Sequence, residues 1–470
     1  MRRRTRGAAW VLLGVGSVVA AMGPVRASPT PGAEPLPGSS IQESGFATPI
    51  QSVVIIDQEN HSFDNVLGKF CDLATRGWIQ RDPCEGATTG VLPDGTIVPL
   101  QRAADLVPKV DHTVEAQQTA IAGGQMNGFG LIPNCTINVT PPPRCYSQFT
   151  TRDQIPNVWD LAKAFALSDH TFELRATPSW AGHMVLASAT VDGFQGDNPT
   201  PGVGARRAPG WGCDSYKDAQ WGPQKVSVPS CVPDSDGNGP YRSSPVQYVP
   251  TIFKELDDAQ RSWTIYGGQG TEGKDGYAWT ICPTFFECLN TQSSHLVPAE
   301  QVLLDAQSGA LPNFSIVTPT TRNSQHNQHF MSVGDSWIGR LIGHIMNGRQ
   351  WSSTAIFLTW DDCGCFYDHV NPLGLNPDWG IRVPMIIISP YVRSGYTDSS
   401  PATFASLLAF TEHLFGLQPL TQDDASAYDY HDSFNFHQSP LRPIPVTRTK
   451  VPAWKVAWMR THPDTNEDGT

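Results

Sequence analysis

The chain has 470 residues, of which 39% are hydrophobic and 16% are charged, and its formal net charge at pH 7 is −12. This length allows one large α/β domain or two smaller ones, and the composition supports a packed core while excluding a protein embedded in a membrane. The acidic balance also excludes electrostatic binding of nucleic acid.

The first 27 residues predict a secretory signal peptide. The start at 1–6 is basic, an apolar segment runs from Ala8 to Met22, and Val25-Arg26-Ala27 places small residues at the −3 and −1 positions of a cleavage site. Consecutive arginines suggest twin-arginine export. Cleavage would remove five arginines and no acid, which takes the net charge from −12 to −17. Residues 28–48 are rich in proline, serine and glycine and predict a flexible leader.

Strand-like and helix-like patterns alternate beyond the leader. Short apolar runs rich in β-branched residues predict buried strands at 52–56, 263–266, 314–317, 355–360 and 383–389. Apolar residues at helical spacing predict helices at 158–165 after Pro156, at 252–256, at 333–345 and at 404–414 before Gly416. This alternation favours an α/β fold with a mainly parallel sheet covered on both faces. We expect a catalytic domain at 49–417 and a C-terminal tail packed on it at 418–470.

All ten cysteines lie beyond the signal peptide and form five pairs of close neighbours: Cys71/Cys84, Cys135/Cys145, Cys213/Cys231, Cys282/Cys288 and Cys363/Cys365. An even count in an exported protein favours disulfides, although spacing alone does not fix the pairing. Long stretches rich in glycine, proline and cysteine at 66–108, 127–150, 191–248 and 267–300 are interpreted as insertions over one end of the sheet, each held by a local disulfide. Cys363 and Cys365 could form a strained bridge or bind a metal, and we favour disulfides with unknown partners.

Two of the predicted strands are followed directly by oxygen-bearing side chains. Glu59-Asn60 comes soon after the strand at 52–56, and Asp361-Asp362 comes after the strand at 355–360. Ligands of open α/β sheets bind just beyond the carboxyl ends of the strands, so these four side chains could hold one divalent cation and support hydrolytic chemistry. The alternative for Asp361-Asp362 is a solvated pair of acids.

Ser179 is the candidate nucleophile. It follows Pro178 and precedes an expected helical run at 184–187. A serine at a helix start lies beside unpaired backbone N–H groups and the positive end of the helix dipole. A cation held by the four ligands could lower the pKa of the hydroxyl and bind the alkoxide. The alternative is a serine that only caps the helix.

Histidines could bind a phosphoryl oxygen or protonate a leaving group near neutral pH, and the candidates are His112, His326, His329 and His369. An isolated histidine is more often structural. His369 departs most from that expectation, because it follows Asp362 by seven residues in a motif-like loop. We expect His61 only to flank the site, and we assign no role to His431, His437 or His462.

Together these segments resemble the bacterial phosphoesterase family that contains non-haemolytic phospholipases C and related acid phosphatases. The resemblance covers most of the chain and rests on six segments in the family's order: 59–64, 111–129, 177–190, 324–326, 361–370 and 382–392. The first segment, Glu-Asn-His-Ser-Phe-Asp, and the fifth, which begins Asp-Asp-Cys-Gly-Cys-Phe-Tyr-Asp-His, are the most specific.

The resemblance implies an alkaline-phosphatase-like, three-layer α/β/α sandwich and a covalent phosphoserine mechanism. Carried over by position, it implies that the metal ligands are Glu59, Asn60, Asp361 and Asp362, together with the nucleophile Ser179. It also implies that His112, His326 and His369 surround the phosphoryl group. In this mechanism the Ser179 alkoxide attacks phosphorus in line, one histidine protonates the leaving alcohol, and water hydrolyses the phosphoserine.

The chain departs from the family pattern in three places. Asp361-Asp362 stands where many members have Asp-Glu, and this form resembles the acid-phosphatase side. Cys363-Gly364-Cys365 stands where Gly-Gly is usual. Ala181-Gly182-His183 replaces Pro-Asn-Arg and removes an arginine that would help to hold substrate, for which His183 could partly substitute. These departures concern substrate preference and catalytic power rather than the ligands or the nucleophile.

We therefore expect an exported, metal-dependent phosphoesterase of the acid-phosphatase kind, with no transmembrane segment in the mature protein. The alternatives are a phospholipase C and a non-catalytic secreted binding protein on the same scaffold. A phospholipase C would need an apolar patch for a phospholipid surface, and the aromatic residues that could form it, if they are not loop core, are Trp180, Trp211, Trp221, Phe285 and Phe286. The oxygen-rich ligand set favours Ca²⁺, Mg²⁺ or Mn²⁺, although Zn²⁺ also accepts carboxylates.

Overall fold

The computed structural model describes residues 48–135, 144–202, 208–270, 275–447 and 450–462. The predicted signal peptide, and all but the last residue of the predicted leader, lie outside these described residues. Among the helices that the structure describes, none has the length and apolar character needed to cross a membrane.

An eight-stranded sheet forms the centre of the fold, with the strand order β12-β11-β13-β1-β14-β15-β6-β16. Only β15 runs against its neighbours, and all other pairings in this sheet are parallel. The strands are β1 (Ser52–Gln58), β6 (Ala166–Ser168), β11 (Trp263–Gly267), β12 (Leu296–Pro298), β13 (Phe314–Val317), β14 (Thr354–Trp360), β15 (Met385–Ile388) and β16 (Thr397–Asp398). The expected, mainly parallel sheet is confirmed, and all five predicted strands belong to it.

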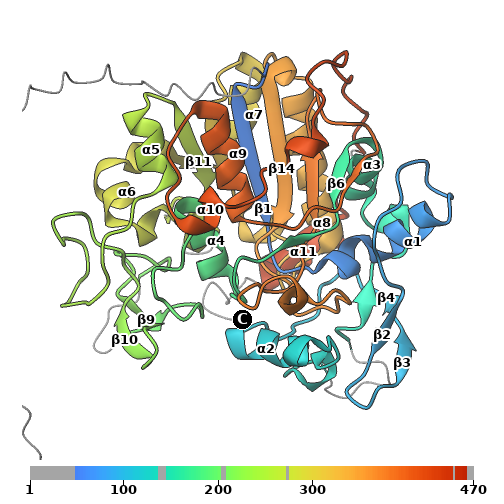
Figure 1. Ribbon diagram of the computed structural model, residues 1–470, viewed down its shortest axis with the longest axis horizontal. Coiled ribbons are helices and arrows are strands. Elements are labelled where there is room, and N and C mark those ends of the chain that lie inside the picture. Colours follow the sequence, from blue (N-terminus) through green and yellow to red (C-terminus); the bar gives the residue numbers. More distant parts are fainter. Residues whose placement is uncertain (1–47, 136–143, 203–207, 271–274, 448–449, 463–470) are drawn as a thin grey trace, which may run out of the picture. The chain divides into compact units, whose positions relative to one another are not determined.

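Helices cover both faces of this sheet, as Figure 1 shows for α9 in front of the sheet and α8 behind it. The helices α3 (Pro156–Ala164), α7 (Gln301–Ser308) and α8 (Met331–Met346) pack together, and so do α4 (Ser179–Ser188), α5 (Ile252–Asp258), α9 (Ala405–Phe415) and α10 (Gln422–Ala425). Every residue of β1 and β14 is buried, which is expected of strands covered on both sides. The three-layer α/β/α architecture is therefore confirmed.

The predicted insertions carry short elements of their own. The helices are α1 (Lys69–Thr75) and α6 (Phe286–Thr291), and the strands are β2 (Thr89–Val91), β3 (Ile97–Pro99), β4 (Gln101–Arg102), β5 (Ser147–Gln148), β8 (Thr200–Pro201), β9 (Lys217–Trp221) and β10 (Val226–Pro229). The helix α2 (Val114–Ile121) lies between the first two insertions. A further pair, β7 (Thr171–Phe172) and β17 (Ala402–Thr403), forms a small parallel sheet. In the tail, α11 (Ala453–Thr461) packs Trp458 against Phe330, with 5.2 Å between the ring centroids.

Four disulfides hold the insertions, and they join the neighbours that the sequence suggested: Cys71–Cys84, Cys135–Cys145, Cys213–Cys231 and Cys282–Cys288. The expectation of disulfides at Cys363 and Cys365 is wrong. Both are buried free thiols whose Sγ atoms lie 3.7 Å apart. The other eight cysteines are paired among themselves, so neither thiol has a distant partner.

These two thiols give a direct chemical prediction. In denatured, unreduced protein, two thiols per chain should react with a thiol reagent. In the folded protein almost none should react, because both side chains are buried. Spectrophotometric titration with and without denaturant measures this difference. A denatured count of zero would mean that the 363–365 bridge forms after all.

A buried acid at the end of α9 predicts a pH-dependent stability. Glu412 is only 1% exposed; burial raises the pKa of its carboxyl to about 9, and Asp424 adds to the rise. The folded chain therefore keeps a proton that the unfolded chain releases near its ordinary pKa of 4.5, so this group costs stability increasingly as the pH rises from about 4.5 to 9. Glu412→Gln should raise the melting temperature at pH 8 more than at pH 4.5. Asp236→Asn, on an exposed loop, is the control and should change neither value.

Candidate active site

The two central strands, β1 and β14, place the predicted metal ligands side by side at the carboxyl-end edge of the sheet. Backbone pairing of β1 with β14 continues past the strand ends, where the Asp361 N–H donates to the Gln58 carbonyl oxygen at 2.8 Å. The Asn60 N–H then donates to Asp361 Oδ1, also at 2.8 Å. Asn60 has a φ of +61°, a left-handed conformation that asparagine adopts more readily than most residues. The sharp turn at Asn60 points both pairs of predicted ligands toward each other.

Glycines at two positions allow these segments to approach closely. A Cβ atom on Gly364 would lie 2.0 Å from the Asn60 carbonyl oxygen, so only glycine lets the loop after Asp362 pass over Asn60. The Gly364 N–H also donates to Asp362 Oδ1 at 2.6 Å. A Cβ atom on Gly182 would lie 2.9 Å from the Asp361 carbonyl oxygen, which explains how α4 packs against the same strand end.

Ser179 is the first residue of α4, and its hydroxyl faces the ligands rather than the helix. The hydroxyl donates to Glu59 Oε2 at 3.0 Å, lies 3.5 Å from Asp362 Oδ2 and accepts from Asn60 Nδ2 at 3.3 Å. The N-cap position belongs to Pro178, and the Trp180 N–H is satisfied by Asn198 Oδ1 at 2.9 Å. The alternative of a simple capping serine is therefore wrong.

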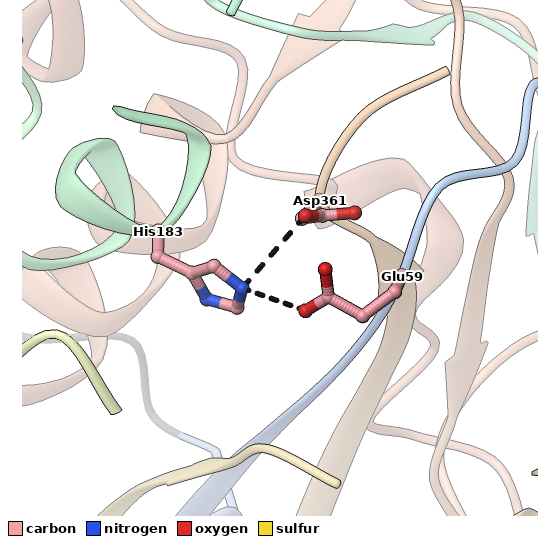
Figure 2. A group of neighbouring side chains, drawn as sticks. All are labelled: Glu59, His183 and Asp361. Atoms are coloured by element: carbon pink, nitrogen blue, oxygen red, sulfur yellow. Dashed lines mark hydrogen bonds and ion pairs between the residues drawn. The ribbon is translucent and has the colours of Figure 1, made fainter. Parts of the chain in front are cut away.

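His183 lies one turn after Ser179 on α4 and points into a group of carboxylates (Figure 2). Its Nε2 is 3.0 Å from Glu59 Oε1 and 3.8 Å from Asp361 Oδ2, and its Nδ1 is 3.1 Å from Asp57 Oδ2. Burial alone would lower the pKa of His183, but the Asp57 and Glu59 carboxylates outweigh it and hold this pKa well above its ordinary range. His183 therefore carries positive charge among these acids, and its role as a partial substitute for the substrate-binding arginine stays a prediction.

Four buried carboxylates face this single imidazolium: Asp57, Glu59, Asp361 and Asp362. Burial and the neighbouring acids raise the pKa of Asp57 and of Asp361 to about 6, and burial raises that of Asp362 to about 7. Asn60 Oδ1 and Asp361 Oδ2 are buried and accept no hydrogen bond from the described residues. Unpartnered hard oxygens and excess negative charge fit a divalent cation. Its ligands would come from Glu59, Asn60, Ser179, Asp361 and Asp362.

Two acids of this region had no assigned role in the sequence. Asp57 could have been found, since it is a charged residue inside the otherwise apolar run of β1. Glu173 gave no signal of this kind. Its Oε1 accepts from the Cys363 N–H at 2.9 Å and its Oε2 accepts from the Thr177 N–H at 3.2 Å. Glu173 therefore ties the loop before Ser179 to the loop after Asp362 and positions both.

Two of the three predicted catalytic histidines lie at this centre. His112 Nε2 is 3.2 Å from Asn60 Nδ2, while His112 Nδ1 is 3.0 Å from the Val110 carbonyl oxygen. Because a carbonyl oxygen can only accept, Nδ1 carries the proton and Nε2 presents its lone pair to the site. Burial lowers the pKa of His112, which keeps the ring neutral. The His326 ring centroid lies 6.0 Å from that of His112, and the His329 centroid lies 6.4 Å from that of His326.

The third histidine, His369, belongs to a different group of side chains. Its Nδ1 is 2.5 Å from Asp64 Oδ2 and its Nε2 is 3.2 Å from Glu85 Oε1. The turn that carries it is fixed by the Asp64 N–H, which donates to Asp368 Oδ2 at 3.0 Å and draws His369 toward Asp64. His61 only flanks the site, as expected, because Asn65 Oδ1 and the Gln325 carbonyl oxygen occupy its two ring nitrogens.

The aromatic residues considered for an apolar patch are mostly core. Trp180, Trp211 and Phe285 are buried, whereas Trp221 and Phe286 are partly exposed. A cavity of about 630 Å³ lies instead beside the segment that leads to Ser179, and its walls include Thr177, Phe194 and Trp379.

The chain is similar to a known protein family and to several known proteins. The model of the "Phosphoesterase family" matches residues 50–418. Non-specific phospholipase C1 of Arabidopsis thaliana is 26% identical over 86% of this chain and 74% of its own length. Phospholipase C A of Mycobacterium tuberculosis (strain ATCC 25618 / H37Rv) is 23% identical over 84% of this chain and 79% of its own length. A protein in the alkaline phosphatase superfamily from Vibrio parahaemolyticus has a TM-score of 0.35 and 13% identity, over 81% of this chain and 69% of its own.

Proposed function

Since this chain belongs to the phosphoesterase family and is a hydrolase of phosphoric ester bonds, we propose that it cleaves its substrate through a phosphoserine formed at Ser179. The observation that carries the proposal is the hydroxyl of Ser179, which lies within 3.5 Å of Glu59, Asn60 and Asp362 at the junction of the two central strands. A helix-terminal serine that makes no capping bond and donates to a buried carboxylate supports the role of a nucleophile, because a neighbouring base can activate its hydroxyl.

In the proposed first step Ser179 Oγ attacks phosphorus while the bond from phosphorus to the leaving alcohol breaks. The hydroxyl proton passes to Glu59 Oε2, which already accepts its hydrogen bond. A divalent cation, when bound, would lower the pKa of the serine and offset the charge of the phosphoryl oxygens. Asn60 Nδ2 donates to Ser179 and fixes the direction of attack.

The two nearby histidines complete the proposed chemistry. Neutral His112 presents Nε2 to the site and orients the Asn60 amide. The His326 ring centroid lies 6.0 Å from that of His112, and His326 is the proposed donor of the proton that the leaving alcohol needs. Water then attacks the phosphoserine and the serine is restored. His369 receives no role in this reaction, because its ring is engaged by Asp64 and Glu85.

The proposed substrate is a phospholipid head group, cleaved as by a phospholipase C. Its support is that the proteins in the comparison that resemble this chain over most of its length include phospholipases C. The cavity beside Thr177 is lined mainly by polar groups, among them Arg175 and Asp378, and offers room for a polar head group. Phosphate monoesters are the second candidate substrate. They are favoured by the Asp361-Asp362 pair, which resembles the form found in the acid phosphatases of the family.

We also propose that the protein acts outside the cytoplasm. The basic and apolar N-terminus predicts export. Eight cysteines joined as four disulfides support an oxidising compartment.

The test compares p-nitrophenyl phosphate with p-nitrophenylphosphorylcholine on purified protein supplied in turn with Ca²⁺, Mg²⁺, Mn²⁺ or Zn²⁺. Faster turnover of the choline diester supports the phospholipase C assignment, and faster turnover of the monoester replaces it with the phosphatase assignment. No turnover of either ester with any of the four ions would favour a non-catalytic binding protein on this scaffold.

A further inference from the structure

A line of buried contacts leads from the core of β1 to the hydroxyl of Ser179. Asp57 Oδ2 lies 3.1 Å from His183 Nδ1, and His183 Nε2 lies 3.0 Å from Glu59 Oε1. The other oxygen of the same carboxylate, Glu59 Oε2, accepts the hydrogen bond of the Ser179 hydroxyl at 3.0 Å. These contacts join Asp57 to the proposed nucleophile, and the reaction described above uses only the last of them.

The Glu59 side chain needs a partner of this kind. Its backbone is fixed separately, because the Glu59 N–H donates to the Ser324 carbonyl oxygen at 3.0 Å. A glutamate has several rotatable side-chain bonds, so a fixed backbone does not decide which oxygen faces the serine. Figure 2 shows His183 Nε2 pointing between Glu59 and Asp361, where it lies 3.8 Å from Asp361 Oδ2. One ring nitrogen thus holds side chains at the ends of both central strands.

Asp57 is a costly residue for its position. It is fully buried in the otherwise apolar run of β1, and neither of its carboxylate oxygens accepts a hydrogen bond from the described residues. Burying a carboxylate without hydrogen bonds costs free energy of folding unless a cation lies against it. The cation that lies against Asp57 is the His183 ring. Holding that ring in place accounts for the presence of the acid.

We propose that Asp57 and His183 are positioning residues of the Ser179 reaction. Asp57 holds the ring at Nδ1, and the ring holds Glu59 Oε1, so that Glu59 Oε2 stays directed at the serine hydroxyl whose proton it takes. This inference rests on the proposed function. It differs from a role of His183 in holding the substrate, since both ring nitrogens already face carboxylates, and the two roles give different kinetics.

Two substitutions separate the two nitrogens of His183. His183→Gln keeps an N–H donor near the position of Nε2, toward Glu59, whereas His183→Asn keeps one only near Nδ1, toward Asp57. We expect kcat on the preferred p-nitrophenyl ester to fall by about 10²-fold in His183→Asn and by less than about tenfold in His183→Gln, with KM unchanged in both. A raised KM at the kcat of the wild type would mean that the ring holds substrate, and would overturn the proposal.

Asp57→Asn protects the test against misfolding, because it keeps the shape of the side chain and removes a buried charge that accepts no hydrogen bond from the described residues. This variant should lower kcat by about tenfold in the wild type and have no further effect in His183→Asn, since Asp57 acts only through the ring. Losses that multiply in the double variant would contradict this order of contacts.

Isothermal titration with the activating ion separates positioning from a general disturbance of the site. His183→Asn should bind that ion no more weakly than the wild type, because it removes a positive charge beside the ligands, and yet turn over slowly. Asp335→Asn is the matched control, a buried acid of α8 that accepts the N–H groups of Asn157 and Val158. It should lower the melting temperature and leave kcat unchanged.

The outcomes distinguish this inference from the proposed function. If the wild type works through Ser179, and both His183→Asn and Asp57→Asn keep kcat within about twofold of it, the positioning role is overturned and the proposed function stands. If Ser179→Ala keeps the activity of the wild type, the proposed function fails and the positioning role fails with it.

Discussion

Ser179→Ala is expected to lower the turnover of the preferred p-nitrophenyl ester by about 10⁴-fold, because it removes the atom that forms the covalent intermediate. The loss should appear in kcat, since the side chains around the hydroxyl stay in place. The fold should be preserved, because Ser179 makes no capping bond and the start of α4 is satisfied by Asn198.

Acid quenching during turnover of a ³²P-labelled ester provides the matching chemical measurement. The wild type should carry label on the peptide that contains Ser179, and Ser179→Ala should carry none. Ser188→Ala is the control on the same helix, since the Ser188 hydroxyl donates only to the Met184 and Thr190 carbonyl oxygens. Activity within tenfold of the wild type in Ser179→Ala would rule out this nucleophile.

The fold and the meeting of the two ligand pairs could be predicted because both depend on short-range patterns. The apolar runs at 52–56 and 355–360 define strands that are buried on both faces, and their parallel pairing places the residues after each strand at one edge of the sheet. Gly416, at a φ of +68°, ends α9 where the sequence predicted that helix to stop.

The position of the His369 ring, the two free thiols and the role of Glu173 depend on contacts between distant segments. The spacing of residues along the sequence does not encode such contacts. His369 stands near the ligand Asp362 in sequence, yet the ion-paired group of Asp64, Asp368 and Arg382 draws its ring toward Glu85. Cys363 and Cys365 have no distant partner because the other cysteines pair locally. The Glu173 carboxylate accepts hydrogen bonds from two backbone N–H groups in loops that are almost 190 residues apart in sequence. No pattern near Glu173 in the sequence indicates that role.

Asp362→Asn should have the second large effect, because it removes one negative ligand from the proposed cation site. We expect activity to fall by at least about 10²-fold and metal affinity to fall with it. The metal-free variant should be no less stable than the wild type. Burial holds the pKa of Asp362 at about 7, so near neutral pH the metal-free wild type already carries a proton there about half of the time, and asparagine imitates that neutral form.

The pH dependence of metal binding distinguishes this explanation from a general disturbance of the site. A cation binds the ionised carboxylates, so affinity in the wild type should rise as the pH increases through about 6 and 7, where Asp361 and Asp362 lose their protons. In Asp362→Asn the step near pH 7 should disappear, and the step of Asp361 should move below pH 6, because the Asp362 charge helps to raise the pKa of Asp361. Isothermal titration with the activating ion at several pH values measures both steps.

Asp236→Asn, on an exposed loop, is the matched control and should leave affinity, activity and pH profile unchanged. Chelation should abolish activity in the wild type, and the activating ion should restore it there but not in Asp362→Asn. If the variant instead kept wild-type affinity at every pH, the cation would have to be held without Asp362. The four carboxylates around His183 would then form a proton-sharing network, with pKa values raised by burial and by each other.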